Sequence, residues 1–389
     1  MDTKVFDPGR DEGVIRHAEL GGPKELGARI FPDDITSCKD LFSQERRDRV
    51  RRVVLYRPFE TVGLSYPIIY GSMLAQYLPK NFQNADFVDF TGLMQLVDAG
   101  QRKVVTPEEG LAAWSQGAKD PDSSVMFFTS QKNPGVRQPY CERASDLTVS
   151  LKNFGTTNDG TFLLYRRTGK TIQDRILGSD RSIQSIQDYQ ARLMKYLGFS
   201  DTPIVGEHNS LPETQYSEIL RQRISGLEAE YQPILDGRPL VVINALKKNP
   251  VHKAGNELEA VLKPVLQEND AVFIVNKGRR TGLSTGIWAR GEALEKRLKE
   301  IAPEKVHDPG PMDLVHLAAM THIADKSGGL SLNVFGGPTL LCDWLGKREI
   351  VLDNQNWDHL IREHPRQTKV LLPFEIPKTV KDALDQNRK

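Results

Sequence analysis

Short apolar runs alternate with longer amphipathic segments along most of this chain. The apolar runs, of about four to six residues, are typical of buried strands, and the segments between them place apolar residues at helical spacing over about ten to fifteen positions. This alternation predicts an α/β fold of parallel sheets covered by helices.

The pattern divides into two similar halves. In the first half it predicts strands over 52–58, 85–91, 124–130 and 160–167, with helices over 63–79 and 185–199. In the second half it predicts strands over 238–245, 270–278 and 348–354, and helices over 256–269, 291–302, 312–324 and 377–386. Each half contains enough alternating elements for one α/β domain.

A polar, Pro-containing stretch near residue 205 is the best candidate for the boundary between these domains. The predicted division is a polar N-terminal extension over 1–50, an N-terminal domain over 51–205, a C-terminal domain over 206–375 and a C-terminal helix or tail over 376–389. Because ligands bind outside the carboxyl ends of parallel strands, we expect two such domains to face a central cleft.

Composition narrows the class of protein. The 52 Lys and Arg residues almost balance the 51 Asp and Glu residues, which argues against a nucleic-acid-binding surface. The three cysteines, Cys38, Cys141 and Cys342, lie far apart, so the sequence suggests neither a disulfide framework nor a zinc site. With no apolar signal segment and no uncharged run long enough to span a membrane, we expect a cytoplasmic protein.

The glycine-rich stretch over 327–337, SGGLSLNVFGG, is the first candidate site. We expect Ser327, Gly328 and Gly329 to precede a helix that runs to Leu345 and is broken near Gly336. Glycines before a helix let backbone N–H groups approach an anion, so a phosphate cradle is one interpretation. An ordinary glycine-rich turn is the other.

Two loops rich in positive charge accompany this stretch, over 244–255 and 276–282. Each follows a predicted strand, so we expect both loops at the same sheet edge as the glycine-rich stretch. The candidate phosphate-binding side chains in them are Lys247, Lys253, Lys277 and Arg279. Solvated lysines on loops are the competing interpretation, while convergence at one edge favours a pyrophosphate.

Four segments, in order, resemble the lipopolysaccharide heptosyltransferases (ADP-heptose transferases), a family of GT-B type glycosyltransferases: RVVLYRP, SIQDYQARLMKYLGF, LVVINALKKNPVHK and MDLVHLAAMTHIADKSGGLS. The resemblance implies two Rossmann-like domains and transfer of a sugar from a nucleotide diphosphate sugar to an acceptor hydroxyl or amine. We also expect the reaction to need no metal or other cofactor; inversion is the expected stereochemical outcome, and retention stays open. The resemblance adds Asn244, Leu330 and Ser331 to the expected donor-binding residues.

The chain departs from the family pattern at catalytic positions. The family's loop aspartate falls on Ser327, and its catalytic aspartate falls on Leu64 or Thr61, depending on the alignment. Glu60 lies beside these positions and is the candidate base, with Asp89, at the end of a predicted strand, as the second candidate.

Two other classes of function stay open. A nucleotide-sugar hydrolase or epimerase would use the same fold without a second substrate, and a non-catalytic GT-B-like protein would bind the nucleotide sugar only. A Rossmann dehydrogenase is disfavoured because no GxGxxG motif follows a predicted strand. The expected partners are the donor and a small-molecule, glycan or protein acceptor, with a second copy of the chain as a further candidate.

Overall fold

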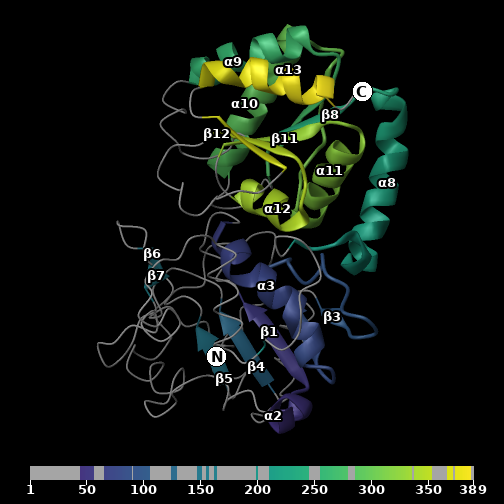
Figure 1. Cartoon of the computed structure of the whole chain (residues 1–389), viewed down its shortest axis with the longest axis vertical. Helices are drawn as coiled ribbons and strands as arrows, with labels where there is room; N and C mark the ends of the chain where they lie inside the picture. The colour runs from purple at the N-terminus through teal and green to yellow at the C-terminus, as the bar shows by residue number, and fades with distance from the viewer. Residues whose placement is uncertain are drawn as a thin grey trace, which may run out of the picture. The chain divides into compact units, whose positions relative to one another are not determined.

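The structure is a computed structural model and describes residues 44–56, 65–89, 91–105, 124–128, 147–150, 155–156, 162–163, 199, 210–244, 255–278, 285–334, 337–352, 366–370 and 373–386. The chain forms two compact units. Elements α2 to β7 belong to the first unit and elements η5 to α13 to the second (Figure 1).

The first unit contains a parallel five-stranded sheet with the order β3-β2-β1-β4-β5. Its elements are α2 (Gln44–Arg49), β1 (Arg52–Tyr56), α3 (Ser65–Asn81), β2 (Asp86–Asp89), β3 (Val104–Val105), β4 (Ser124–Phe128) and β5 (Leu147–Ser150). A short antiparallel pair, β6 (Gly155–Thr156) and β7 (Phe162–Leu163), completes it. Buried side chains such as Val53 of β1, Leu74 of α3 and Phe87 of β2 form its core.

The second unit contains a parallel six-stranded sheet with the order β10-β9-β8-β11-β12-β13. Its elements up to β10 are η5 (Glu213–Gln215), α8 (Glu218–Leu235), β8 (Leu240–Asn244), α9 (Gly255–Glu268), β9 (Val272–Val275), α10 (Thr285–Ile301) and β10 (Val306–His307). They are followed by α11 (Leu314–Lys326), β11 (Leu330–Val334), α12 (Gly337–Leu345), β12 (Glu349–Leu352), β13 (Gln367–Val370), η8 (Pro373–Glu375) and α13 (Ile376–Gln386). Counted within this unit, the strand order is 3-2-1-4-5-6, the order of doubly wound Rossmann folds.

Helices cover both faces of this second sheet (Figure 1). On one face, α9, α10 and α13 bury residues such as Leu266, Leu298 and Val380 against Val241 and Phe273 of the strands. On the other face lie α11 and α12, and α8 packs along α11. Every residue of β8 and β9 is buried, as expected for parallel strands covered on both sides.

The predicted fold class is confirmed, and most of the predicted elements that fall on described residues are present. The helix predicted over 185–199 lies outside the described residues except for Phe199. The strand predicted over 160–167 is described only as the two residues of β7, which pair antiparallel outside the main sheet. The helix predicted to follow Gly329 is wrong, because Leu330–Val334 form strand β11 and the helix begins only at Gly337. Helices α2 and α8 and strands β3, β5, β6, β10 and β13 are not among the predicted elements.

The domain boundary predicted at 205–206 stays a prediction, since residues 200–209 lie outside the described part of the chain. At the two ends of the predicted division, α2 forms a short helix before β1, and α13 packs into the core of the second unit through Ile376, Val380 and Leu384. The last helix is therefore part of the second unit's core.

Candidate functional site

The second sheet reverses its winding direction between β8 and β11. From β8 the chain continues to β9 on one side, whereas from β11 it continues to β12 on the other side. In doubly wound sheets, ligands bind outside the carboxyl ends of the strands at this point. Asn244 ends β8 and is in register with Asn333 of β11, so these two residues mark the candidate site.

Helix α12 begins beside this point. It starts at Gly337, three positions after Val334 ends β11, and Pro338 and Thr339 complete the start of its first turn. Pro338 has no N–H, so Gly337, Thr339 and Leu340 supply the first backbone donors of a helix end that favours negative charge. A helix N-terminus that begins at a glycine shortly after a strand is suited to binding a phosphate.

Thr339 gives this helix start a further polar group. Its side chain is 1% exposed, and its hydroxyl has no hydrogen-bond partner within the described residues. A buried hydroxyl without a partner is unfavourable unless another group satisfies it. The sequence signal for this helix start is GGP, over 336–338, which predicts a break inside a longer helix.

Asn244, predicted to contact the donor, is instead engaged within the protein. Its amide nitrogen donates to Asn333 Oδ1 at 2.8 Å, and its amide oxygen accepts from Asn276 Nδ2 at 2.7 Å. The residue is 2% exposed. Its side chain therefore supports the carboxyl edge of the sheet and does not present a free group to a ligand.

Ser327, Gly328 and Gly329 do not lie at the candidate site, which corrects the prediction of a phosphate cradle there. They close the end of α11 and lead into β11, at the amino edge of the sheet. The Ser327 hydroxyl accepts from Leu240 N at 2.9 Å and donates to Ala324 O at 3.0 Å. Leu240 and Asn244 are four positions apart on β8, so about 13 Å separates the two edges.

Leu330 and Ser331, also predicted to bind the donor, are strand residues at this same end of β11. They pair with Val241 and Val242 of β8, and both are buried. Neither residue reaches the carboxyl edge, where α12 begins.

Lys277 follows β9 directly but is not free to hold a phosphate. Its ammonium group lies 2.5 Å from Asp308 Oδ1 and 2.8 Å from Glu295 Oε2, and its side chain is 4% exposed. Burial lowers the pKa of Lys277, but the hydrogen bonds to Asp308 and Glu295 outweigh this effect and raise it above its ordinary value. The prediction for Lys277 is therefore wrong, and the residue belongs to a buried ion-pair cluster.

Four other predicted residues, Glu60, Lys247, Lys253 and Arg279, lie outside the described residues. In sequence, Glu60 follows β1, the two lysines follow β8, and Arg279 follows Gly278 at the end of the described segment after β9. Their roles stay predictions.

Asp89 is a structural carboxylate. Its Oδ1 accepts from Thr91 N at 2.9 Å, Thr91 Oγ1 at 2.6 Å and Gly92 N at 3.1 Å, and its Oδ2 accepts from Met94 N at 2.8 Å. Burial raises the pKa of Asp89, and the hydrogen bonds oppose this rise. Because Asp89 is 1% exposed and holds the turn after β2, the prediction that it acts as a base is wrong.

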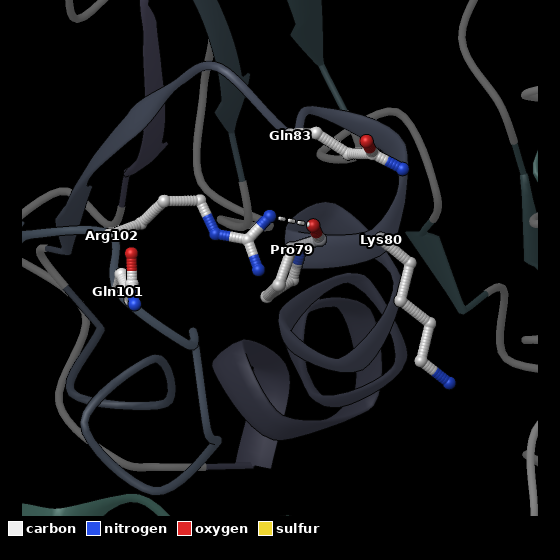
Figure 2. A pocket seen from close by; sticks show the side chains of 5 residues that line it. All are labelled: Pro79, Lys80, Gln83, Gln101 and Arg102. Atoms are coloured by element: carbon white, nitrogen blue, oxygen red, sulfur yellow. Dashed lines mark hydrogen bonds between the residues drawn. The ribbon is translucent and has the colours of Figure 1, made fainter.

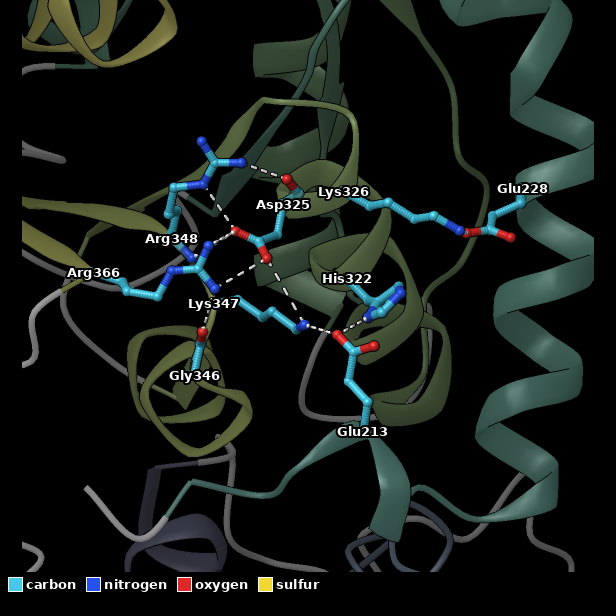
Figure 3. Close-up of polar contacts among 9 residues, drawn as sticks. All are labelled: Glu213, Glu228, His322, Asp325, Lys326, Gly346, Lys347, Arg348 and Arg366. Carbon is cyan, nitrogen blue, oxygen red and sulfur yellow. Dashed lines mark hydrogen bonds and ion pairs between the residues drawn. The ribbon is translucent and has the colours of Figure 1, made fainter. Parts of the chain in front are cut away.

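The described ion pairs gather most densely at the amino edge of the second sheet (Figure 3). Asp325 accepts from Arg348 Nε at 2.9 Å and lies 3.0 Å from Arg366 Nη2 and 3.8 Å from Lys347 Nζ. Lys347 also lies 2.6 Å from Glu213 Oε1. Burial would raise the pKa of Asp325, but the hydrogen bond from Arg348 and the neighbouring cations lower it. These cations are paired with carboxylates and stabilise the fold at this edge.

A pocket of about 670 Å³ lies in the first unit and is lined by Pro79, Lys80, Gln83, Gln101 and Arg102 (Figure 2). These residues precede β2 and β3, so the pocket is at the amino edge of the first sheet. Arg102 donates to the carbonyl oxygens of Pro79 and Ala99, which ties the end of α3 to the turn before β3. The pocket therefore lies at the edge opposite to the one at which ligands bind in such sheets.

Two classes of feature are absent from the described part of the chain. No group of three or more His, Cys, Asp or Glu side chains is placed to hold a metal ion. No helix there combines the length and apolar character needed to cross a membrane.

Solved structures share this architecture. The chain is similar to the glycosyl transferase family 9 protein from Veillonella parvula, with 16% identity, a TM-score of 0.51, and coverage of 86% of this chain and 90% of the other. It is also similar to ADP-heptose LPS heptosyltransferase II from E. coli, with 11% identity, a TM-score of 0.52, and coverage of 87% and 100%. No protein-family model and no curated protein sequence matches the chain. The predicted resemblance is confirmed at the level of the two-domain, Rossmann-like GT-B fold.

Proposed function

We propose that the chain is a glycosyltransferase that takes a sugar from a nucleotide diphosphate sugar. The donor diphosphate binds at the carboxyl edge of the second sheet, at the N-terminus of α12. Lys247 and Lys253, which follow β8 in the sequence, and Arg279, which follows β9, supply positive charge. Such charge stabilises the diphosphate as it leaves during transfer.

The observation that carries this proposal is the junction of β11 and α12 at the winding reversal. It combines three features: the switch point between β8 and β11, the glycine-containing helix start, and the buried Thr339 hydroxyl without a described partner. Each favours an anionic group at the same place, and the shared fold with two glycosyltransferase structures makes a nucleotide diphosphate sugar the best candidate.

The proposed chemistry assigns the acceptor to the first unit, with Glu60 as the base that deprotonates it. The Glu60→Gln variant is then expected to bind the donor normally and to lose turnover by about 100-fold or more. Near-normal turnover would remove Glu60 from the mechanism. The loss of the second candidate base, Asp89, to a structural role makes this variant the main test of base catalysis.

The first experiment measures binding of nucleoside diphosphates and their sugars by calorimetry and by thermal stabilisation. One nucleotide should stabilise the protein by several degrees, since binding to the folded state alone shifts unfolding by mass action. If no nucleoside diphosphate or sugar derivative binds at millimolar concentration, the proposal fails.

Thr339→Val tests the site itself. It removes one hydroxyl with little change of shape, and we expect nucleoside diphosphate affinity to fall about 10-fold, the effect of one hydrogen bond to a charged group. Thr321→Val is the matched control, because Thr321 is an equally buried threonine, located on α11 against Cys342. Equal losses in both variants would contradict the placement of the diphosphate at α12.

The basic residues are tested in the same assay. Lys247→Ala, Lys253→Ala and Arg279→Ala should each weaken binding, and more strongly at low salt. Lys263→Ala, on the exposed side of α9, is the control and should have no effect. Release of free sugar without any acceptor would indicate a hydrolase, and donor binding without any turnover would indicate a binding protein.

A further inference from the structure

Five polar side chains form a continuous hydrogen-bonded chain across the second sheet, here called the amide chain: the buried Asn276, Asn244, Asn333 and Glu349, and the half-buried Gln367. Asn276 Nδ2 donates to Asn244 Oδ1 at 2.7 Å, and Asn244 Nδ2 donates to Asn333 Oδ1 at 2.8 Å. Asn333 Nδ2 donates to Glu349 Oε2 at 2.5 Å, and Gln367 Nε2 donates to Glu349 Oε1 at 2.7 Å.

Each link of the amide chain crosses one strand boundary. Asn276 directly follows β9, and the other four side chains belong to β8, β11, β12 and β13, which are consecutive in the sheet. Neighbouring strands are about 4.8 Å apart, so the amide chain spans about 19 Å. It therefore connects β12 and β13 with the two strands that flank the candidate site.

The two ends of the amide chain determine its direction. The backbone N–H of Gly278 can only donate, and it donates to Asn276 Oδ1 at 2.9 Å. The amide nitrogen of Asn276 must therefore face Asn244, and the same logic orients Asn244 and Asn333 in turn. At the other end Glu349 accepts at both carboxyl oxygens. All donors from Gly278 to Asn333 thus point toward Glu349.

Because the amide chain is largely buried, the direction of its hydrogen bonds matters for stability. Asn244, Asn276, Asn333 and Glu349 are each no more than 4% exposed, so a reversed amide would leave a donor or acceptor without a partner and without water. Burial also raises the pKa of Glu349 well above its ordinary value, against the hydrogen bonds from Gln367 and Asn333. The fold retains a costly acidic side chain at the end of the amide chain.

We propose that Glu349 is a positioning residue for the candidate site. As the terminal acceptor it orients Asn333 next to the β11–α12 junction, and through Asn244 and Asn276 it fixes the turn at Gly278, which leads into Arg279. The proposal rests on the proposed function for its effect on ligand affinity. Its effect on the Gly278 turn is independent of that function.

Glu349→Met removes the terminal acceptor while keeping an unbranched side chain. We expect hydrogen exchange of the Gly278 amide to become faster and nucleoside diphosphate affinity to fall about 10-fold, as for loss of one hydrogen bond that holds the site. In Glu349→Gln, both the exchange rate of the Gly278 amide and the nucleoside diphosphate affinity should stay within about 2-fold of the wild type. When the Gln367 amide rotates, the new side chain at position 349 can accept from Asn333 and donate to Gln367.

Two further variants separate positioning from general stability. Ile350 lies on the same strand, but its side chain faces α9 and α13. The Ile350→Val variant should therefore lower the stability of the protein without changing the amide chain. Adding Asn333→Asp to Glu349→Met supplies a new acceptor for Asn244 one strand nearer the site, with the number of acidic groups unchanged. This double variant should restore Gly278 protection and affinity.

The outcomes distinguish the two proposals. Wild-type Gly278 exchange in Glu349→Met, or equal acceleration in Ile350→Val at matched stability, would overturn the role of Glu349. Glu349→Met itself could fail to fold. In that case, a double variant that folds and protects the Gly278 amide supports the positioning role of Glu349. A double variant that also fails to fold overturns that role. If the wild type binds no nucleoside diphosphate, the proposed function fails, while the exchange measurements still decide whether Glu349 positions the turn.

Discussion

Gly329 lies directly against the main chain of Leu240. A Cβ atom at position 329 would be 1.8 Å from the Leu240 carbonyl oxygen and 2.8 Å from its nitrogen. The glycine therefore permits the close approach of β11 to the start of β8, next to the hydrogen bond from Leu240 N to Ser327 Oγ. This packing explains a glycine that the sequence alone suggested as part of a phosphate site.

Gly329→Ala should be severely destabilising, because the added carbon collides with backbone that two strands hold in place. We expect a loss of about 4 kcal/mol or more in the free energy of unfolding, or failure to fold. Urea unfolding measures this directly. Gly226→Ala is the control, since Gly226 is exposed within α8 with no atom near the new Cβ, and it should gain about 0.5–1 kcal/mol. A mild effect of Gly329→Ala would contradict the close approach.

Lys277→Met should be destabilising by about 3–5 kcal/mol, because it leaves the buried carboxylate of Glu295 without its closest buried cation. Lys299→Met is a matched control: Lys299 Nζ pairs with the same carboxylate at 2.8 Å but is 37% exposed, so its loss should cost less than about 1 kcal/mol. Thermal or urea unfolding of both variants gives the comparison. Equal effects would show that Lys277 is no more than a surface partner.

Regular elements of this chain could be predicted because their burial leaves a periodic pattern. Strands β8 and β9 are buried on both faces and read as continuous apolar runs. Helix α8 carried a comparable signal in Leu220, Ile224, Leu227 and Tyr231, its four buried residues at spacings that return to one face. It was missed because many charged residues separate them and a polar boundary segment precedes it.

The site was harder to predict because glycine has two different uses in this sequence. Gly328 and Gly329 end a helix and allow a close backbone approach, whereas Gly337 begins α12 and Gly336 precedes it in the sequence. Strand β11, LSLNV, alternates apolar and polar residues as a strand does, but the glycines on either side of it favour a turn followed by a helix. The polar residues of β11, Ser331 and Asn333, face the buried side of the sheet toward Cys342. Only the strand pairing shows which glycines lie at the carboxyl edge.

Asp325→Asn should have a pH-dependent effect on stability. The neighbouring cations lower the pKa of Asp325 in the folded protein below its ordinary value of about 3.9. The stabilisation is therefore fully present above that ordinary value and is lost as the pH falls through the lowered folded value. Consequently, the difference in unfolding free energy between wild type and Asp325→Asn should be constant near pH 7 and shrink below about pH 4.

Urea unfolding at a series of pH values checks this dependence. Asp382→Asn, at an exposed position on α13, provides a carboxylate-to-amide control. A difference for Asp325→Asn that stays unchanged down to pH 2 would show that the cations around Asp325 do not act through its charge.

Asp89 offers a test that separates a structural carboxylate from a catalytic one. Asp89→Ala removes the acceptor of three backbone N–H groups and of the Thr91 hydroxyl. We expect it to lower the free energy of unfolding by about 3–4 kcal/mol. The loss is smaller than three complete desolvation penalties because water can enter the loosened turn. Asp89→Asn keeps an oxygen for Thr91 and Gly92 and relieves the burial of a charge, so only its contact with Met94 N becomes unfavourable. We expect it to cost about 1 kcal/mol.

The same two variants examine the chemistry. Because the carboxylate is buried and held by four donors, Asp89→Asn should retain donor binding and any measured sugar transfer within a few-fold of the wild type. A loss of transfer of about 100-fold in a stable Asp89→Asn protein would instead identify a base at this position, since an amide cannot accept the proton. Comparing Asp89→Asn with Glu60→Gln in one assay therefore decides which carboxylate after the first sheet's strands takes part in the reaction.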